Sequence, residues 1–202
     1  MIITIGREYG SGGREIGGVV AKKLQIPFYD KEILTRAAQD SGLCPEVLEH
    51  HDEHARIGYF FSGNAFHEGS LGSTLQMPLP QRVFLAQFEA IGKLAAEGPC
   101  VIVGRCADYV LREREDVFHV FLYAGEEKRI ERIMRVENCD EDKARELIRK
   151  TDKERKNYYN FYTDGDWGCR GKYDAMLRTD NHTADEMADV IILLAKGKIG
   201  EA

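Results

Sequence analysis

The sequence of 202 residues contains no long apolar run, no Cys-x-x-Cys pair and no excess of basic charge. Because no hydrophobic stretch approaches the roughly 20 residues of a membrane-spanning helix, we expect no membrane partner. The five cysteines are scattered and odd in number, which argues against a disulfide framework and against a zinc site. A net charge of −6 disfavours polymeric nucleic acid as a partner and favours small anionic ligands held in a local basic cleft.

The start of the chain also lacks the features of a secretory signal. Residues 1–10 have no basic segment, no apolar core and no small-residue cleavage site, so we expect a cytoplasmic protein. A chain of this length is long enough for one well-packed domain and too short for two large ones. We therefore expect a single domain over residues 1–202, with insertions.

Short apolar, β-branched runs alternate along the chain with segments of helical periodicity. The runs predict strands at residues 2–5, 26–30, 100–104, 117–124 and 173–179. The periodic segments predict helices at residues 14–24, 31–42, 80–97 and 125–158. Strands separated by helices indicate an α/β fold with a mostly parallel sheet that is covered on both faces.

A glycine-rich loop, "GREYGSGGRE", joins the first predicted strand to the first predicted helix. Such a loop directs backbone N–H groups and the positive end of the helix dipole at one point, which makes an anion site. Aligned with the phosphate-binding motif G-x-x-x-x-G-K-[ST], Gly12 takes the second glycine position. Arg7 then takes the first glycine position and Gly13 the lysine position. The loop keeps its glycines but lacks the lysine that contacts phosphates.

We predict that the loop amides and a displaced arginine hold the phosphates of ATP. The residues assigned to ATP are Gly10, Ser11, Gly12, Gly13, Arg14 and Glu15. Arg14, next to the vacant lysine position, is the first candidate for the missing charge and Arg7 is the second, because a guanidinium binds phosphate oxygens bidentately. The alternative is a purely structural turn with a solvated Arg14.

Four stretches, "IITIGREYGSGGREIG", "IPFYDKEIL", "VIVGR" and "DKERKNYYNFYT", together resemble the cytidylate kinase-like family, and the resemblance covers nearly the whole chain. It implies a P-loop kinase three-layer sandwich with a five-stranded parallel sheet. It also implies two helical insertions, a monophosphate-binding one at residues 45–97 and a lid region at residues 125–172. The implied chemistry is transfer of the ATP γ-phosphoryl group to a nucleoside monophosphate, with Mg²⁺ as cofactor.

The same resemblance implies roles for individual side chains. Asp152 and Arg155 match an Asp-x-x-Arg sequence of the lid, and Cys106 departs from the family by standing where it has an aspartate. The catalytic candidates are Arg14, Arg105, Asp152 and Arg155. The acceptor-binding candidates are Asp30, Arg36 and Arg105. In the last strand and helix, Asp180 or Thr183 is expected to cap the helix.

The metal ligand remains open. Phosphoryl transfer needs positioned cations and usually a magnesium ion. The carboxylates that could hold it are Glu15, Asp30 and Asp108. A second acidic and histidine-rich run, residues 49–54, could bind a metal through His50 and His54, but a solvated helix face is the more common explanation of such a run.

Two further alternatives concern function. The chain could be a non-catalytic nucleotide- or phosphate-sensing protein, or a kinase whose acceptor is a small molecule other than a nucleotide. An aromatic set near the predicted lid could stack on a base or pack the lid helices together. Its members are Tyr158, Tyr159, Phe161, Tyr162 and Trp167.

Overall fold

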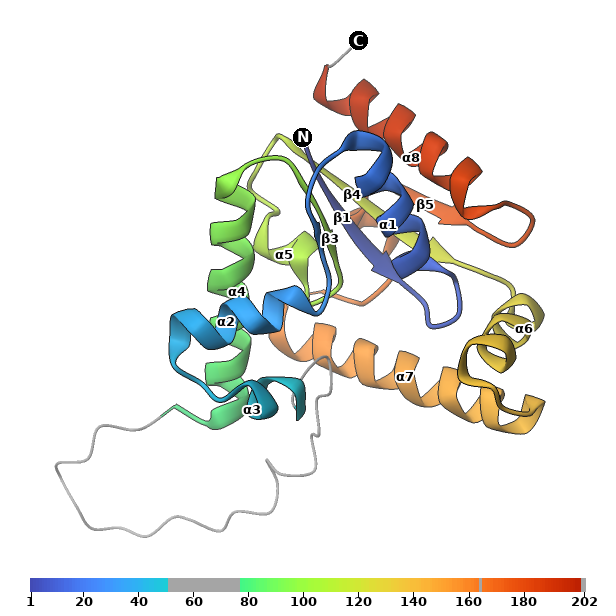
Figure 1. Ribbon diagram of the computed structural model, residues 1–202, viewed down its shortest axis with the longest axis horizontal. Coiled ribbons are helices and arrows are strands. Elements are labelled where there is room, and N and C mark those ends of the chain that lie inside the picture. Colours follow the sequence, from blue (N-terminus) through green and yellow to red (C-terminus); the bar gives the residue numbers. More distant parts are fainter. Residues whose placement is uncertain (51–76, 164, 201–202) are drawn as a thin grey trace, which may run out of the picture.

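The computed structural model describes residues 1–50, 77–163 and 165–200, and it contains a five-stranded sheet in which all pairs are parallel (Figure 1). The strands follow the order β2-β3-β1-β4-β5. Their bounds are Ile2–Arg7 (β1), Phe28–Tyr29 (β2), Cys100–Val103 (β3), Val117–Tyr123 (β4) and Ala175–Arg178 (β5). The five predicted strands and the α/β class are confirmed, although β2 is shorter than predicted.

One face of the sheet is apolar and is covered by two helices. Ile3 and Ile5 point to this face and pack in one cluster with Ile16, Val20 and Ile191. The helices are α1 (Gly13–Leu24) and α8 (Ala184–Ile199). Because burying each such side chain contributes about 1.5–3 kcal/mol, this cluster fixes the start of α1 against the end of β1.

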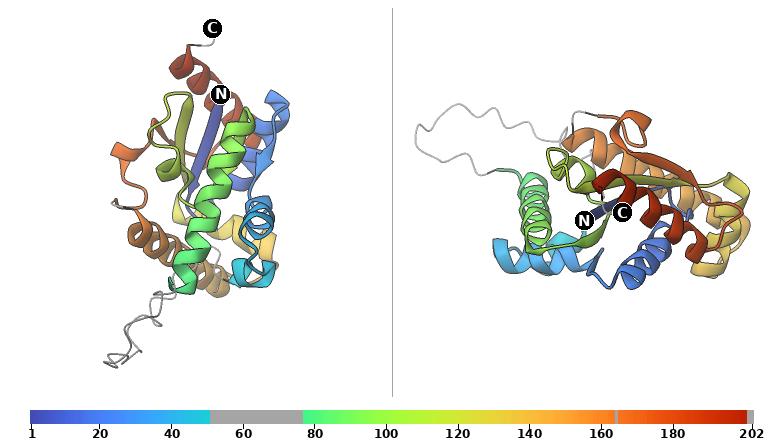
Figure 2. Two further views of the ribbon diagram at one scale, coloured as in Figure 1. Left: turned by 90° about the vertical axis from the view of Figure 1, so that its left-hand side faces the viewer. Right: turned by 90° about the horizontal axis from the view of Figure 1, so that it is seen from above.

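The opposite face carries a second apolar cluster, in which Ile2 and Ile102 of the sheet pack with Ala90 and Ile91. Figure 2 shows the helix of residues 79–97, in green, beside the sheet. The helices on this side are α2 (Glu32–Ser41), α3 (Pro45–His50), α4 (Leu79–Glu97) and the short α5 (Ala107–Val110). Although α4 falls within the segment expected to bind the acceptor, residues 45–97, its apolar face packs on the sheet as part of this helical layer. The three layers of the expected sandwich are therefore two helical layers and the sheet between them.

The charged segment predicted as one helical stretch, residues 125–158, forms two helices. Asn138 ends the first in a left-handed conformation, with φ 49°, and Asp140 caps the second by accepting a hydrogen bond from the Lys143 amide at 2.8 Å. The two are α6 (Glu126–Glu137) and α7 (Glu141–Tyr162), and the 3₁₀ turn η2 (Arg170–Lys172) follows. In Figure 1, α7 crosses the lower end of the molecule from α6 towards α4.

The last helix, α8, begins with a complete capping box. The Thr183 hydroxyl accepts from the Glu186 amide, and the Glu186 carboxylate accepts from the Thr183 amide. Of the two expected caps, Thr183 is therefore the cap and Asp180 is not. No helix in the described ranges is long and apolar enough to cross a membrane.

Candidate active site

The glycine loop lies where β1 ends and α1 begins. Gly10 and Gly12 adopt φ values of 83° and 85°, which glycine reaches without the steric cost that other residues meet. Gly12 is the N-cap of α1 and provides no side-chain hydrogen bond to the first turn. The first amides of a helix have no partner within the helix, so this end of α1 presents donors and a partial positive charge to an anion.

An open pocket of about 720 Å³ lies in front of this loop. It is bounded by the loop, the start of α1, the ends of β2 and β3, and the helices α6 and α7. The predicted site residues that line it are Gly10, Gly12, Gly13, Arg14, Glu15, Asp30, Arg105 and Arg155. The predicted residues that do not line it are Ser11, Arg36, Asp108 and Asp152.

At the ends of β2 and β3, a buried ion pair forms one wall of the pocket. Asp30 accepts from the Arg105 Nη1 at 3.0 Å, and its second carboxylate oxygen lies 2.9 Å from the Arg14 Nε. Arg105 is almost fully buried and has φ 51°, a conformation that non-glycine residues adopt only when the surroundings enforce it. Arg14, which is largely exposed, therefore bridges the loop to the acidic residue after β2.

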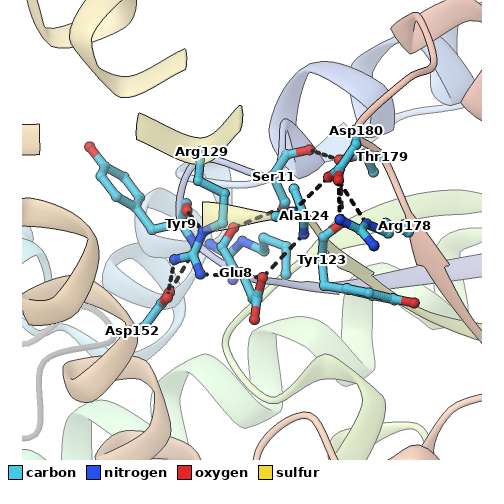
Figure 3. A network of polar contacts seen from close by, with 12 residues as sticks. Glu8, Tyr9, Ser11, Tyr123, Ala124, Arg129, Asp152, Arg178, Thr179 and Asp180 are labelled. Atoms are coloured by element: carbon cyan, nitrogen blue, oxygen red, sulfur yellow. Dashed lines mark hydrogen bonds and ion pairs between the residues drawn. The ribbon is translucent and has the colours of Figure 1, made fainter. Parts of the chain in front are cut away.

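Two charged residues anchor the loop to α6 and α7, in the segment expected to form the lid (Figure 3). Asp152 of α7 accepts from the Tyr9 amide at 2.8 Å and also pairs with Arg129 of α6. Arg129 in turn donates from its Nε to the Tyr9 carbonyl at 2.7 Å and lies 3.3 Å from Glu8. Asp152, expected to act in catalysis, does not line the pocket and holds the loop in place through the Tyr9 amide.

A second set of contacts ties the loop to β4 and β5. Thr179 donates to the Ser11 carbonyl at 2.8 Å, and the Ala124 amide donates to Glu8 at 3.2 Å. Burial raises the pKa of the Glu8 carboxyl, against the lowering effect of that amide. The Gly125 amide, which donates to Asp180 at 2.7 Å, is the main cause that lowers the pKa of the Asp180 carboxyl. Ser11 is buried, and its contacts are internal to this framework.

Arg132 of α6 is a site residue that the sequence interpretation missed. A Cβ atom added to Gly12 would lie 2.5 Å from the Arg132 Nη1, so this guanidinium lies directly against the loop. Arg132 also pairs with Glu15 at 2.6 Å. The sequence shows that Arg129 and Arg132, three residues apart, share one face of a helix, but it does not show that this face meets the loop.

Asp108 lies apart from the other two metal candidates. It lines a separate cavity of about 20 Å³ beyond the end of β3, and its carboxylate accepts from the Tyr159 hydroxyl at 2.7 Å. Burial is the main cause that raises the pKa of the Asp108 carboxyl. Arg7, Arg105 and Arg155 line both this cavity and the larger pocket.

The aromatic set packs α7 against its neighbours. Phe84 of α4 stacks on Tyr162 with 4.2 Å between the ring centroids, and Tyr158 donates to Gln87 at 2.7 Å. Trp167 meets Phe121 edge to face at 5.4 Å. Of the two alternatives for this set, these contacts support helix packing.

Arg36 is placed away from the other candidates. It pairs with Asp40 at 3.2 Å and with Glu97 at 2.9 Å, near the end of α4. Residues 51–54 of the histidine-rich run and the side chains of residues 49 and 50 lie outside the described residues. Within the described ranges, no group of three or more histidine, cysteine or acidic side chains could hold a metal ion.

Beside the loop there is a second pocket, of about 250 Å³. Its basic lining comes from Lys128, Arg132 and Arg135 of α6, and Thr179 and Asp180 line its other side. Gly10 and Arg132 border both this pocket and the larger one. The two spaces therefore adjoin at the glycine loop.

Comparison with known proteins agrees with this geometry. A profile described as "Cytidylate kinase-like family" matches residues 2–181. No curated protein matches the chain. An uncharacterized protein from Eubacterium ventriosum is 28% identical, with a TM-score of 0.71 and coverage of 97% of this chain and 98% of that one.

Two kinases share the fold at low identity. A gluconokinase from Sinorhizobium meliloti has a TM-score of 0.57 at 15% identity, over 98% of this chain and 93% of that one. A shikimate kinase from Acinetobacter baumannii, solved with shikimate, has a TM-score of 0.54 at 16% identity, over 97% of this chain and 92% of that one. The fold is that of the P-loop kinases.

Proposed function

Because the chain belongs to the cytidylate kinase-like family, we propose that it transfers the γ-phosphoryl group of ATP to a nucleoside monophosphate of the cytidylate type. One observation carries this proposal: five arginines from five separate segments line the same pocket as the glycine loop. They are Arg7, Arg14, Arg105, Arg132 and Arg155. Phosphoryl transfer is catalysed mainly by positioning and by neutralising phosphate charge, which is the chemistry that such a set supplies.

The donor nucleotide is assigned to the loop and to the space beside it. The loop amides and the N-terminal end of α1 would hold the ATP phosphates. The adjoining pocket of about 250 Å³, which meets the loop at Gly10, would take the nucleoside. In this arrangement α6 and α7 act as the lid, since they carry Arg132 and Arg155 over the phosphates.

The acceptor is assigned to the wall of the large pocket where Asp30 and Arg105 form their ion pair. The Arg105 guanidinium can bind the acceptor phosphate, and Asp30 fixes the orientation of this guanidinium by pairing with it. An acceptor phosphate oxygen forms the new bond to the γ-phosphorus as the bond to the departing ADP breaks. Arg155 lines both cavities and would neutralise charge between the two substrates.

Magnesium, which this family implies, fits the donor set of the large pocket. Glu15 and Asp30 line that pocket, whereas Asp108 lines the separate small cavity, so the first two are the carboxylates suited to hold the ion directly or through water. The ion, when bound to the triphosphate, neutralises negative charge during transfer. Glu15 and Asp30 would keep it beside the loop.

The test is a coupled assay of ADP release with Mg²⁺ and ATP. The acceptors are CMP, dCMP, UMP, AMP and GMP, with shikimate and gluconate as non-nucleotide acceptors and ATP alone as the blank. We expect turnover that depends on a pyrimidine monophosphate and that falls in Arg105→Ala. Turnover confined to shikimate or gluconate would contradict the proposed acceptor. ATP binding without turnover on any acceptor would contradict the kinase proposal and favour a sensor.

A further inference from the structure

The position of the missing lysine is filled by another side chain. Gly13 is the first residue of α1 and stands where the phosphate-binding motif has its lysine. A Cβ atom added to Gly13 would lie 2.7 Å from the Arg7 Cβ and 2.9 Å from the Arg7 Cγ. Non-bonded carbon atoms prefer about 3.5–4.0 Å, so a side chain at residue 13 and the stem of Arg7 exclude one another.

Arg7 is held firmly at this place. It is the last residue of β1 and pairs in register with Leu122 of β4. Its carbonyl accepts from the Arg155 Nη1 at 3.1 Å. Its side chain lines the large pocket together with Gly12 and Gly13. The stem of Arg7 therefore starts from the sheet and takes the space where the Cβ of a lysine at residue 13 would lie.

We propose that Arg7 supplies, from the first glycine position of the motif, the positive charge that the lysine supplies elsewhere. The two departures from the motif, an arginine at residue 7 and a glycine at residue 13, are then one exchange: the large side chain at one position requires the absence of a side chain at the other. This assignment rests on the proposed function, because it concerns the ATP phosphates.

The other arginines of the pocket have different placements. Arg14 reaches Asp30 at the acceptor end and is largely exposed, and Arg132 comes from α6 and pairs with Glu15. Arg7 alone among these three starts within the sheet, so strand pairing fixes its backbone. Its guanidinium can contact two phosphate oxygens at once, where a lysine offers a compact point charge.

The experiment measures ATP and AMP affinity by titration calorimetry in the wild type and in four variants. Arg7→Gln keeps most of the stem and removes the charge, and Arg7→Ala removes both. The double variant Arg7→Gly/Gly13→Lys removes the Arg7 Cβ, which would lie 2.7 Å from a Cβ at residue 13, and moves the charge to the usual lysine position. Arg112→Ala, an exposed arginine that lies over Tyr109, is the control for loss of a surface arginine. Circular dichroism checks that each variant is folded.

We expect ATP to bind about 10- to 100-fold more weakly to Arg7→Gln and Arg7→Ala, the range for loss of a hydrogen bond to a charged group. AMP, which lacks the β- and γ-phosphates, should bind nearly as it does to the wild type. The double variant should recover most of the lost ATP affinity, and the control should equal the wild type.

Each contrary result has a distinct meaning. Unchanged ATP affinity in Arg7→Gln, with ATP binding intact in the wild type, would overturn the assignment of Arg7 alone and transfer the role to Arg14 or Arg132. A double variant that binds no better than Arg7→Ala would overturn the idea of an exchange. Failure of the wild type to bind ATP would overturn the proposed function and this assignment with it.

Discussion

Two helices that pack side by side on one face of the sheet, α1 and α8, begin in opposite ways. At α8, Thr183 and Glu186 form a capping box that satisfies the first amides from within the chain. At α1, Gly12 caps with no side chain at all. Both helices follow a strand of the same sheet, so the difference does not come from their place in the fold.

The comparison shows that the start of α1 lacks a stabilising side-chain cap that the start of α8 has. A capping side chain contributes about 1 kcal/mol to a helix, and α1 lacks that contribution. Its loop is stabilised from outside, by Asp152 through the Tyr9 amide and by Thr179 through the Ser11 carbonyl. Side chains cap the starts of α7 and α8, whereas the start of α1, which borders the large pocket, has no side-chain cap and keeps its amides for an anion.

The largest effect is expected when the same acidic residue is placed at both N-caps. Gly12→Asp puts a carboxylate where the triphosphate would lie, and Gly12→Asn, of the same size and uncharged, controls for the left-handed backbone and for the contact with Arg132. At about 4 Å and an effective dielectric constant of about 20, two like charges repel by about 4 kcal/mol, so ATP affinity should fall by more than about 100-fold. Thr183→Asp keeps a good capping residue and should leave ATP affinity unchanged. Equal ATP affinity in the two variants, measured by calorimetry, would refute the distinction between the helices.

A smaller loss is expected when the external anchor of the loop is removed. Asp152→Ala leaves the Tyr9 amide and Arg129 without this acceptor, so the free energy of unfolding should fall by about 2–3 kcal/mol. Urea denaturation measures it. Asp142→Ala, an exposed residue in the first turn of the same helix, is the control and should change little. A loss as small as that of the control would show that the loop holds its shape without α7.

A further variant tests how much the side-chain cap stabilises α8. Thr183→Ala should lower the free energy of unfolding by about 1 kcal/mol and the melting temperature by about 2–4 °C. ATP affinity should not change, because no residue of α8 is among the phosphate contacts proposed above. A clear loss of ATP affinity would mean that the start of α8 is coupled to the site.

The smallest effect concerns pH. The Thr183 amide is the main cause that lowers the pKa of Glu186 below its usual value of 4.5. Because the pKa of Glu186 is lower in the folded protein, the ionised carboxylate stabilises the fold at pH values above 4.5. This contribution is lost as the pH falls through the folded-state pKa. The melting temperature of Glu186→Gln should therefore approach that of the wild type as the pH is lowered from neutrality to about 4. A gap that is constant with pH would contradict an ionised cap.

The sequence predicted the fold well, because buried parallel strands are apolar runs that stand out from amphipathic helices. The resemblance placed Asp30 and Arg105 in one acceptor site, and the structure pairs them, because parallel strands end at the same edge of a sheet. The sequence did not reveal the contact of Arg132 with the loop, and it grouped Arg36 with side chains from which the structure separates it. Both lie on helices, and which face of a helix meets the pocket depends on packing that local sequence does not encode.

The glycine loop is a second place where the sequence did not reveal which side chains are in contact. The alignment identified Gly13 as the vacant lysine position and preferred the adjacent Arg14 as its replacement. The structure brings Arg7 against Gly13 across the turn of the loop, a contact between residues six apart that follows from the geometry of the turn. Adjacency in sequence was therefore a poor guide to which side chain shares the space.

The long helix α7 connects the two ends of this molecule that a transfer reaction must bring together. Within seven residues, or about 10 Å of helix, it contacts the glycine loop through Asp152 and Asp108 of α5 through Tyr159. An intact helix is stiff over such a length, so the two contacts are held at a fixed spacing. In the proposed reaction, α7 would therefore join the phosphate-binding loop to the segment after β3 as one rigid strut.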